Sequence, residues 1–367
     1  MLQSVMKFDG AQAIKYRWET KDYVAALHQK MKAVSFYNHL PITDSQSFVD
    51  ISMDAPRPRP RDLLVEVRAI SVNPVDAKIR GGAGPGRPDG QMPILGWDAA
   101  GVVKEVGAEV TLFEPGDEVY YAGSVDRPGS YAEFQCVDER IVGRKPRTLG
   151  FAETAALPLT TITAWEMLFD RLRMNDSTEG SLLILGGAGG VGSIATQLAS
   201  ELTCLAVICT ASRPETVQWC MDMGADQVID HRKPLAKQVK AIVPGGVNYV
   251  LALTKTEDHF DQLVEAMKPQ SAMALIENPA RPLDITKLKP KSISLHWEFM
   301  FTRSRYETFD MGEQGRLLNE VADLVDDGRI RSTIQTNLGA INAANLKQAH
   351  ARVESGKAIG KIVLAGF

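Results

Sequence analysis

The sequence contains few cysteines, no strong excess of charge and no long apolar run. Its four cysteines include no C-x-x-C pair of the kind that binds metal or carries redox chemistry, so we expect reduced core thiols in a cytoplasmic protein: Cys136, Cys204, Cys209 and Cys220. The net charge of -4 gives no basic surface for nucleic acid. No apolar run approaches the roughly 20 residues of a membrane helix. Neither nucleic acid nor a membrane is therefore an expected partner.

The length of 367 residues and the hydrophobic content of 44% favour two cores rather than one. Residues 1–30 lack the apolar core of a signal peptide and are a poor transit peptide, so we place them outside the fold as a leader or extension. The run 31–36 is strand-like and marks the expected start of the first lobe.

The first half of the chain has the pattern of a β-rich lobe. Residues 63–69 alternate apolar with polar side chains, and residues 101–107 form another strand-like run bounded by glycines. Between them, residues 81–88 are rich in glycine and proline, which favours a surface loop. That loop is either a plain connector or a rim over a substrate pocket.

From about residue 155 the pattern changes to alternating buried strands and helices, which specifies a parallel sheet with right-handed crossovers. The expected strands cover 181–186, 205–209, 248–253 and 271–276, and helices are expected after residue 190, over 214–223, and at Phe260, Leu263, Val264 and Met267. Beyond about residue 300 we expect a helix over 313–326, a strand over 330–334, a helix over 346–353 and a strand over 361–364. Periodicity leaves open whether this last part extends the sheet or returns to the first lobe.

A glycine-rich turn lies between the strand over 181–186 and the next helix. Its sequence, Gly187-Ala188-Gly189-Gly190-Val191-Gly192, has the G-x-G-x-x-G spacing of a Rossmann nucleotide site. In such a site the first glycine permits the tight turn, the second lets the backbone approach a pyrophosphate, and the third lets helix and strand pack closely. The free N–H groups at the helix start face the phosphates. We therefore expect a bound dinucleotide.

The end of the next strand indicates which dinucleotide. An NAD site would place an acidic residue there against the ribose hydroxyls, whereas this chain has Ser212 and Arg213. A guanidinium binds phosphate oxygens through two parallel donors, so the pair favours the 2'-phosphate of NADP. Ser212 and Glu215 also match a capping box for the following helix, and one hydroxyl could serve both purposes.

Several motifs together resemble the medium-chain dehydrogenase/reductase superfamily, in particular its zinc-free quinone-oxidoreductase branch and the zinc-type alcohol dehydrogenase-like proteins. Besides the glycine turn, the motifs lie at 71–76, 93–101, 116–119, 129–133 and 155–161. The resemblance covers residues 31–367. It implies an α/β fold with a GroES-like β-barrel catalytic domain over 31–156 and 300–367, and a Rossmann doubly wound parallel sheet that binds NADP over 157–299. It also implies a homodimer formed through an edge strand at 292–297.

The chain departs from the zinc enzymes of that superfamily at the ligand positions. A catalytic zinc needs three protein ligands and an open position. Where those enzymes carry a cysteine and a histidine, this chain has Asn73 and Gly96-Trp97-Asp98, and its six histidines form no ligand-spaced pair. We therefore expect no metal, and we expect Trp97 to line the pocket.

The resemblance also implies roles for individual residues. Asn73 is expected beside the nicotinamide and the substrate, and Thr161 near the carboxamide. His231 occupies a position where relatives carry a tyrosine that reaches the 2'-phosphate. Three residues are candidates for proton delivery or orientation, each with a structural alternative as a solvated or barrel-packing residue: Asp76, Lys78 and Tyr120.

Without a Lewis acid, hydride addition to an acceptor that is already electrophilic is the easier chemistry. The first hypothesis is therefore an NADPH-dependent oxidoreductase that reduces a small quinone, enone or related conjugated carbonyl. A metal-free alcohol or carbonyl oxidoreductase of the same fold remains an alternative. A third possibility is an NADPH-binding protein with a non-catalytic role.

Overall fold

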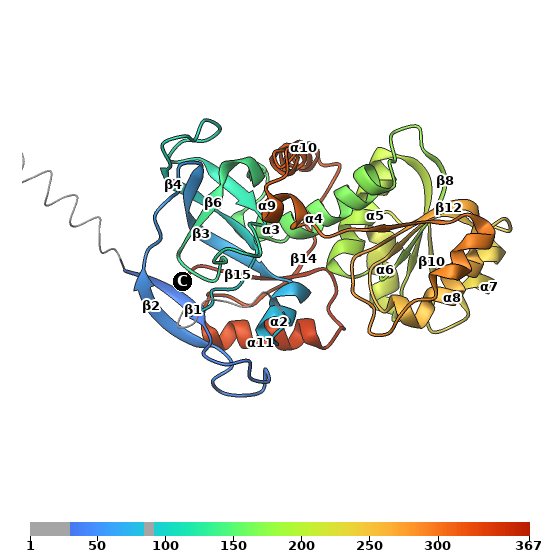
Figure 1. Cartoon of the computed structure of the whole chain (residues 1–367), viewed down its shortest axis with the longest axis horizontal. Coiled ribbons are helices and arrows are strands. Elements are labelled where there is room, and N and C mark those ends of the chain that lie inside the picture. The colour runs from blue at the N-terminus through green and yellow to red at the C-terminus, as the bar shows by residue number, and fades with distance from the viewer. Residues whose placement is uncertain (1–29, 84–91) are drawn as a thin grey trace, which may run out of the picture.

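The computed structural model describes residues 30–83 and 92–367, which form two lobes connected by helix α4 (Figure 1). Most of the predicted leader, residues 1–29, lies outside the described residues, as does most of the loop expected over 81–88. The first strand begins at Lys30, one residue before the predicted start. None of the helices in the described part of the chain is long and apolar enough to cross a membrane.

The first lobe is a β-barrel of mainly antiparallel strands. Its seven-stranded sheet has the order β14-β15-β3-β4-β5-β7, with β6 also paired to β3, and β1 and β2 form a separate antiparallel pair. The strands are β1 Lys30–Ser35, β2 Val49–Asp54, β3 Asp62–Val72, β4 Asp98–Val106, β5 Glu118–Tyr121, β6 Phe134–Asp138, β7 Val142–Arg144, β14 Ile334–Asn337 and β15 Lys361–Ala365.

The C-terminal segment returns to this first lobe. Strand β15 pairs antiparallel with β3, with Ile362 opposite Val72, and the red elements of Figure 1 lie beside the blue and teal ones. The predicted strand over 330–334 was misplaced, because β14 begins only at Ile334. Ahead of it, the backbone N–H of Arg331 donates to Gln197 Oε1 of the second lobe at 2.9 Å, which holds this stretch outside the ladder.

The second lobe is a Rossmann-type parallel sheet with helices on its faces. Its strand order is β10-β9-β8-β11-β12-β13, and every adjacent pair is parallel. Successive strands are added outward on one side of β8 and then on the other side from β11. Ligands of doubly wound folds bind at this switch point, between β8 and β11. The strands are β8 Glu179–Leu185, β9 Cys204–Thr210, β10 Gln227–Ile229, β11 Val247–Ala252, β12 Met267–Leu275 and β13 Ser294–Trp297.

Helices lie in both lobes: α5 to α8 pack on the parallel sheet, α2, α3, α10 and α11 pack on or beside the barrel, and α4 joins the lobes. They are α2 Pro74–Arg80, α3 Phe151–Ala155, α4 Pro158–Trp165, α5 Gly190–Leu202, α6 Pro214–Asp222, α7 Leu235–Ile242, α8 Thr256–Ala266, α9 Thr302–Tyr306, α10 Glu313–Asp326 and α11 Ala343–Glu354, with short turns η1 Glu139–Ile141, η2 Glu166–Arg171 and η3 Ile285–Lys291. Met267, expected in a helix, instead begins β12 directly after α8. Cys204 is exposed at the start of β9, so the expectation of a core thiol was wrong there.

Candidate functional site

The glycine turn connects β8 to α5 at the carboxyl edge of the parallel sheet. A residue with positive φ, Gly186 at 90°, lies one position before the motif. Thr210 at the end of β9 fixes the start of the turn, because its Oγ1 accepts a hydrogen bond from Gly186 N at 2.9 Å. Gly187 is required for packing, because a Cβ atom there would lie 2.6 Å from Cys209 Cβ.

The other two motif glycines differ in the space that surrounds them. A Cβ atom at Gly192 would lie 2.4 Å from the carbonyl oxygen of Gly186, so helix and strand meet tightly there. At Gly189 a Cβ atom would meet only that same oxygen, at 3.4 Å. Gly189 is also the N-cap of α5 and has no side chain to cap the helix. The start of α5 therefore presents backbone N–H donors, beginning at Gly190 and Val191, beside an open surface that suits a phosphate.

The residues predicted to select the dinucleotide lie along the same edge of the sheet. Ser212 and Arg213 follow β9, and His231 follows β10, whose end is tied to β9 by a hydrogen bond from Ala211 N to Ile229 O of 3.0 Å. The Arg213 guanidinium is partly exposed, contacts Glu215 at 3.3 Å and donates to the carbonyl of Lys357 at 3.0 Å. These contacts leave further guanidinium donors for a ligand.

Two details of this edge differ from expectation. The predicted capping box of Ser212 and Glu215 was wrong: the N-cap of α6 is Arg213, whose backbone N–H donates to Thr216 Oγ1 at 3.1 Å. Ser212 therefore has no part in capping that helix. The His231 ring lies 6.4 Å from that of His259 on α8, and burial lowers its pKa. At neutral pH the imidazole is thus uncharged and offers one donor.

The glycine turn also contacts the first lobe and the connecting helix α4. Gly360 N donates to Ala188 O at 2.9 Å, and a Cβ atom at Gly190 would lie 2.9 Å from Lys361 Cδ. On α4, Thr161 is fully buried and its hydroxyl has no hydrogen-bond partner among the described residues. An unpartnered buried hydroxyl is costly, and a polar ligand group such as a carboxamide would satisfy it.

A buried carboxylate, that of Asp98, organises the side chains where the lobes meet. Its Oδ2 accepts hydrogen bonds from Ser71 Oγ at 2.7 Å, Asn73 Nδ2 at 2.8 Å and Lys361 Nζ at 3.0 Å. Its Oδ1 accepts one from the backbone of Leu159 in α4, at 2.7 Å. The carboxylate thus connects β3, β4, β15 and the connecting helix.

Asn73, predicted to lie beside the nicotinamide, is held within this network. Its amide donates to Asp98, and its Oδ1 accepts a short hydrogen bond from Lys361. Both polar atoms of the amide are therefore in use, which fixes its orientation. Sequence reasoning missed Asp98 and Lys361 as members of the site, because no local motif relates residues 263 positions apart.

Asp76 is the one proton-delivery candidate in a chemically unusual environment. It is fully buried in α2, and burial raises its pKa to about 7, against the opposing effect of the hydrogen bond from Asn73 N at 2.7 Å. The Tyr131 hydroxyl lies 3.1 Å from the same carboxylate oxygen and 3.0 Å from His350 Nε2. Burial lowers the pKa of His350 to about 3, so that ring is neutral. Asp76 can hold a proton near neutral pH.

The other two candidates occupy structural positions. Tyr120 is fully buried in β5, and its hydroxyl donates to the carbonyl of Leu318 in α10 at 2.6 Å, which favours barrel packing over a role in chemistry. Lys78 is about half exposed and pairs with Glu277 of the second lobe at 3.1 Å. That pair links the two lobes across the site.

The positions that hold zinc in the zinc enzymes contain residues that do not fit the metal. Trp97 is buried, donates from its indole to the carbonyl of Ser124 at 2.9 Å, and packs edge-on against Phe301. The Asn73 amide is engaged as described above. Within residues 30–83 and 92–367, no three histidine, cysteine, aspartate or glutamate side chains are clustered as a metal site would need.

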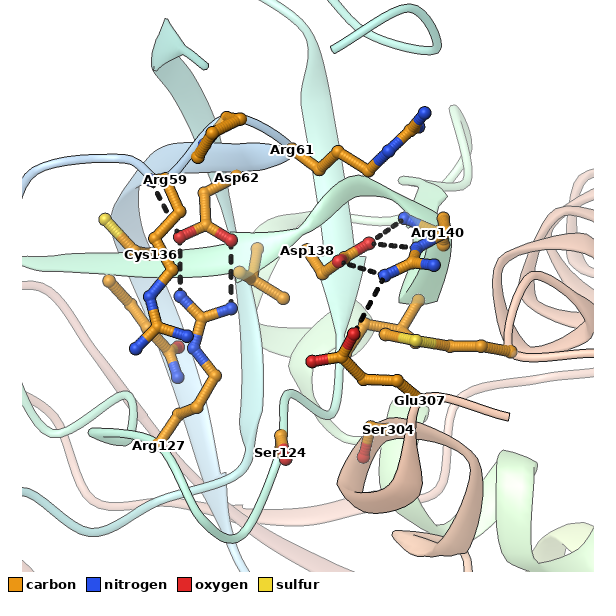
Figure 2. A pocket seen from close by; sticks show the side chains of 15 residues that line it. Arg59, Arg61, Asp62, Ser124, Arg127, Cys136, Asp138, Arg140, Ser304 and Glu307 are labelled. Carbon is orange, nitrogen blue, oxygen red and sulfur yellow. Dashed lines mark hydrogen bonds and ion pairs between the residues drawn. The ribbon is translucent and has the colours of Figure 1, made fainter. Parts of the chain in front are cut away.

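A cavity of about 210 Å³ lies elsewhere, between the barrel and α9, and is lined by several arginines (Figure 2). Three of its four arginines face carboxylates: the Arg127 guanidinium forms two hydrogen bonds to Asp62, that of Arg140 forms two to Asp138 and lies 3.9 Å from Glu307, and Arg61 pairs with Glu139. None of its lining residues belongs to the glycine turn or to α4. The internal charge pairing makes this cavity a poor site for an anion.

Comparison with known protein families agrees with this geometry. Residues 59–158 match the alcohol dehydrogenase GroES-like domain, and residues 223–364 match the family described as zinc-binding dehydrogenase. A zinc-type alcohol dehydrogenase-like protein of Staphylococcus epidermidis is 37% identical over 91% of this chain and 99% of its own length. A tomato 2-methylene-furan-3-one reductase is 28% identical over 92% of this chain and 80% of its own.

Solved structures give the same result. A putative zinc-dependent alcohol dehydrogenase protein from Rhizobium etli has a TM-score of 0.89 and 55% identity, covering 93% of this chain and 99% of that one. A mycobacterial protein solved with NADPH has a TM-score of 0.78 and 25% identity, covering 91% and 99%. The protein belongs to the medium-chain dehydrogenase/reductase superfamily and, within it, to the zinc-type alcohol dehydrogenase-like proteins. It is accordingly an oxidoreductase that uses a nicotinamide dinucleotide.

Proposed function

We propose that the protein is an NADPH-dependent reductase of conjugated carbonyl compounds, quinones or enones, and that it works without a metal. The observation that carries this proposal is the pair of residues at the former zinc positions. Trp97 and Asn73 have their polar groups satisfied within the protein, so neither can hold a Lewis acid. An acceptor that is already electrophilic does not need one.

The residues proposed to bind the dinucleotide offer suitable groups for each of its parts. The open surface at Gly189 and the start of α5 suit the pyrophosphate, and the Thr161 hydroxyl suits the carboxamide. Arg213 and His231 offer donors to a 2'-phosphate. When bound, NADPH supplies the hydride. The NADPH complex of the mycobacterial relative supports this assignment.

The remaining side chains position the acceptor and hold a proton. We infer that the Trp97 and Phe301 rings, which are buried and pack edge-on against each other, form the inner wall of the acceptor site, and the ion pair between Lys78 and Glu277 spans the lobes. Asp76, which can be protonated near neutral pH, is the proposed proton source for the reduced acceptor. The tomato relative, by its name an enone reductase, is consistent with such an acceptor.

The proposal is tested by following NADPH oxidation with a panel of quinones, enones, simple aldehydes and ketones. Turnover of quinones or enones, unchanged by removal of metals with a chelator, is expected. Turnover of aldehydes alone would contradict the proposed acceptor class and favour the metal-free carbonyl oxidoreductase. Stoichiometric zinc in elemental analysis of untagged, active protein would contradict the metal-free mechanism.

A further inference from the structure

Two cysteines are buried directly against the glycine turn. Cys209 is the penultimate residue of β9, Cys220 lies in α6, and neither side chain is exposed. A Cβ atom at Gly187 would lie 2.8 Å from Cys209 Sγ and 3.0 Å from Cys220 Sγ. Both sulfur atoms therefore face the same point of the turn.

The two thiols are not equivalent. The proximity of the two thiols lowers the pKa of Cys220 and, together with burial, raises the pKa of Cys209 well above its usual value. Cys220 is thus the better nucleophile, and Cys209 retains its proton. Thiol–disulfide chemistry needs this asymmetry between an attacking and a resolving cysteine.

Cys220 is fully buried in helix α6, so an oxidant reaches it only when this helix opens locally. The helix has nine residues, and its Val217 and Met221 side chains are exposed. It contacts β10, a three-residue strand at the edge of the sheet. Short elements at an edge open at a lower free-energy cost than the core does. Local opening of α6 would therefore expose Cys220 to a small oxidant without unfolding the lobe.

We propose that Cys209 and Cys220 form a reversible disulfide that lowers the affinity of the adjacent turn for the dinucleotide, an inference that rests on the proposed function. The oxidant is a peroxide. The Cys220 thiolate attacks one oxygen of hydrogen peroxide, the O–O bond breaks, and water leaves as Cys220 becomes a sulfenic acid. The Cys209 thiol then attacks the Cys220 sulfur, the S–S bond forms and a second water leaves. Two thiols and one peroxide thus give one disulfide and two waters.

Formation of the disulfide would shift the glycine turn through side-chain packing. A disulfide bond is about 2.05 Å long, shorter than a hydrogen bond between thiols, so β9 and α6 must approach each other. Gly187 lies against both sulfur atoms. Cys209 Sγ is also 3.1 Å from Thr196 Oγ1, which donates to the carbonyl of Gly192 at 2.7 Å. A shift of Cys209 therefore acts on both ends of the glycine motif.

The test uses a full-length variant in which Cys136→Ser and Cys204→Ser leave only the pair. Reduced and peroxide-treated protein are compared by intact mass, by peptide mapping and by NADPH affinity. We expect loss of two hydrogen atoms, a decrease in NADPH affinity of about tenfold or more, and recovery with dithiothreitol. Saturating NADPH should slow the cross-link, because it holds the turn in place.

The matched control adds Cys220→Ala, after which peroxide should change neither the cross-link signal nor NADPH affinity. Absence of the disulfide when Cys220 is oxidised to sulfenic or higher acids would overturn the inference. A complete disulfide with NADPH affinity within about twofold of the reduced protein would also overturn it. If the reduced protein binds no NADPH, the proposed function fails instead, while the mass still shows whether the disulfide forms.

Discussion

The ammonium of Lys361 and the carboxylate of Asp98 form a buried ion pair, with Nζ and Oδ2 3.0 Å apart and both side chains at most 3% exposed. Among the described residues, Asp98 has three further donors, from Ser71, Asn73 and Leu159, whereas Lys361 has only the Asn73 and Val72 oxygens as further partners. The lysine ammonium therefore loses more of its stabilisation than the carboxylate does when the ion pair is broken.

Replacing Asp98 should consequently cost more stability than replacing Lys361. We expect Asp98→Asn to lower the free energy of unfolding by about 3 kcal/mol or more, because it leaves an uncompensated buried ammonium. Lys361→Met should cost less. Guanidinium unfolding measures both, and Lys78→Met, which removes an exposed ion pair with Glu277, serves as the control with an expected loss under about 1 kcal/mol. A loss for Asp98→Asn no larger than the control would contradict the argument.

Alanine substitutions at two glycines of the motif should have different effects, one on stability and the other on NADPH binding. Gly187→Ala places a methyl group against two cysteines and should lower the free energy of unfolding by about 1–3 kcal/mol, partly recovered when Cys220→Ala is added. Gly189→Ala should leave stability unchanged and weaken NADPH binding, since the new methyl group makes only an ordinary contact with Gly186 O at 3.4 Å and lies where the pyrophosphate is proposed to bind. Gly245→Ala, with nothing within 4 Å of the new methyl, is the control. Unfolding curves and NADPH titrations check the split, and equal loss of binding in both motif variants with no loss of stability would refute it.

These two cases show what the sequence could and could not predict. The G-x-G-x-x-G turn, the parallel strands and the strand-helix order depend on local periodicity, so they were predictable from residue spacing alone. The Asp98 network was not, because Lys361 reaches it only when β15 pairs with β3. The left-handed residue at Gly186 and the N-cap at Arg213 depend on one-residue details of the chain path, which spacing does not determine.

Arg213 should distinguish NADPH from NADH. Its free donors are proposed to face the 2'-phosphate, so Arg213→Ala should raise the dissociation constant of NADPH about tenfold and leave that of NADH within about twofold. Fluorescence titration with both nucleotides measures this ratio. Arg281→Ala, which removes an exposed arginine paired with Asp258, is the control. Equal losses for the two nucleotides would count against a role of Arg213 in selecting NADPH.

The raised pKa of Asp76 predicts a specific pH dependence of stability. In the folded protein the carboxyl keeps its proton up to about pH 7, whereas in the unfolded chain it ionises near 3.8. The native state therefore binds more protons across that window. This contribution to stability falls by about 1.4 kcal/mol per pH unit as the pH rises through the window, and it levels off above it. Asp76→Asn should remove this slope. Both proteins are compared by urea unfolding at pH 5, 6, 7 and 8 in a His350→Gln background, because the buried neutral His350 ring otherwise contributes a slope of opposite sign below about pH 6.5.

The free edge of the parallel sheet predicts a homodimer, which we propose forms through β13. Within the part of the chain that the structure describes, this strand pairs only with β12, and beside its other edge Trp297 is 51% exposed and Phe299 44% exposed. An unpaired edge with exposed aromatic side chains is unfavourable for a monomer, and a two-fold axis would cover the edges of both copies at once.

Trp297→Lys should raise the dimer dissociation constant about thirtyfold, since a buried interface tryptophan typically contributes at least about 2 kcal/mol. Phe309→Lys, which adds the same charge at a fully exposed aromatic outside the strand, should not change it. Sedimentation velocity over a range of concentrations measures both, and a monomeric parent protein or equal effects of the two variants would refute this interface.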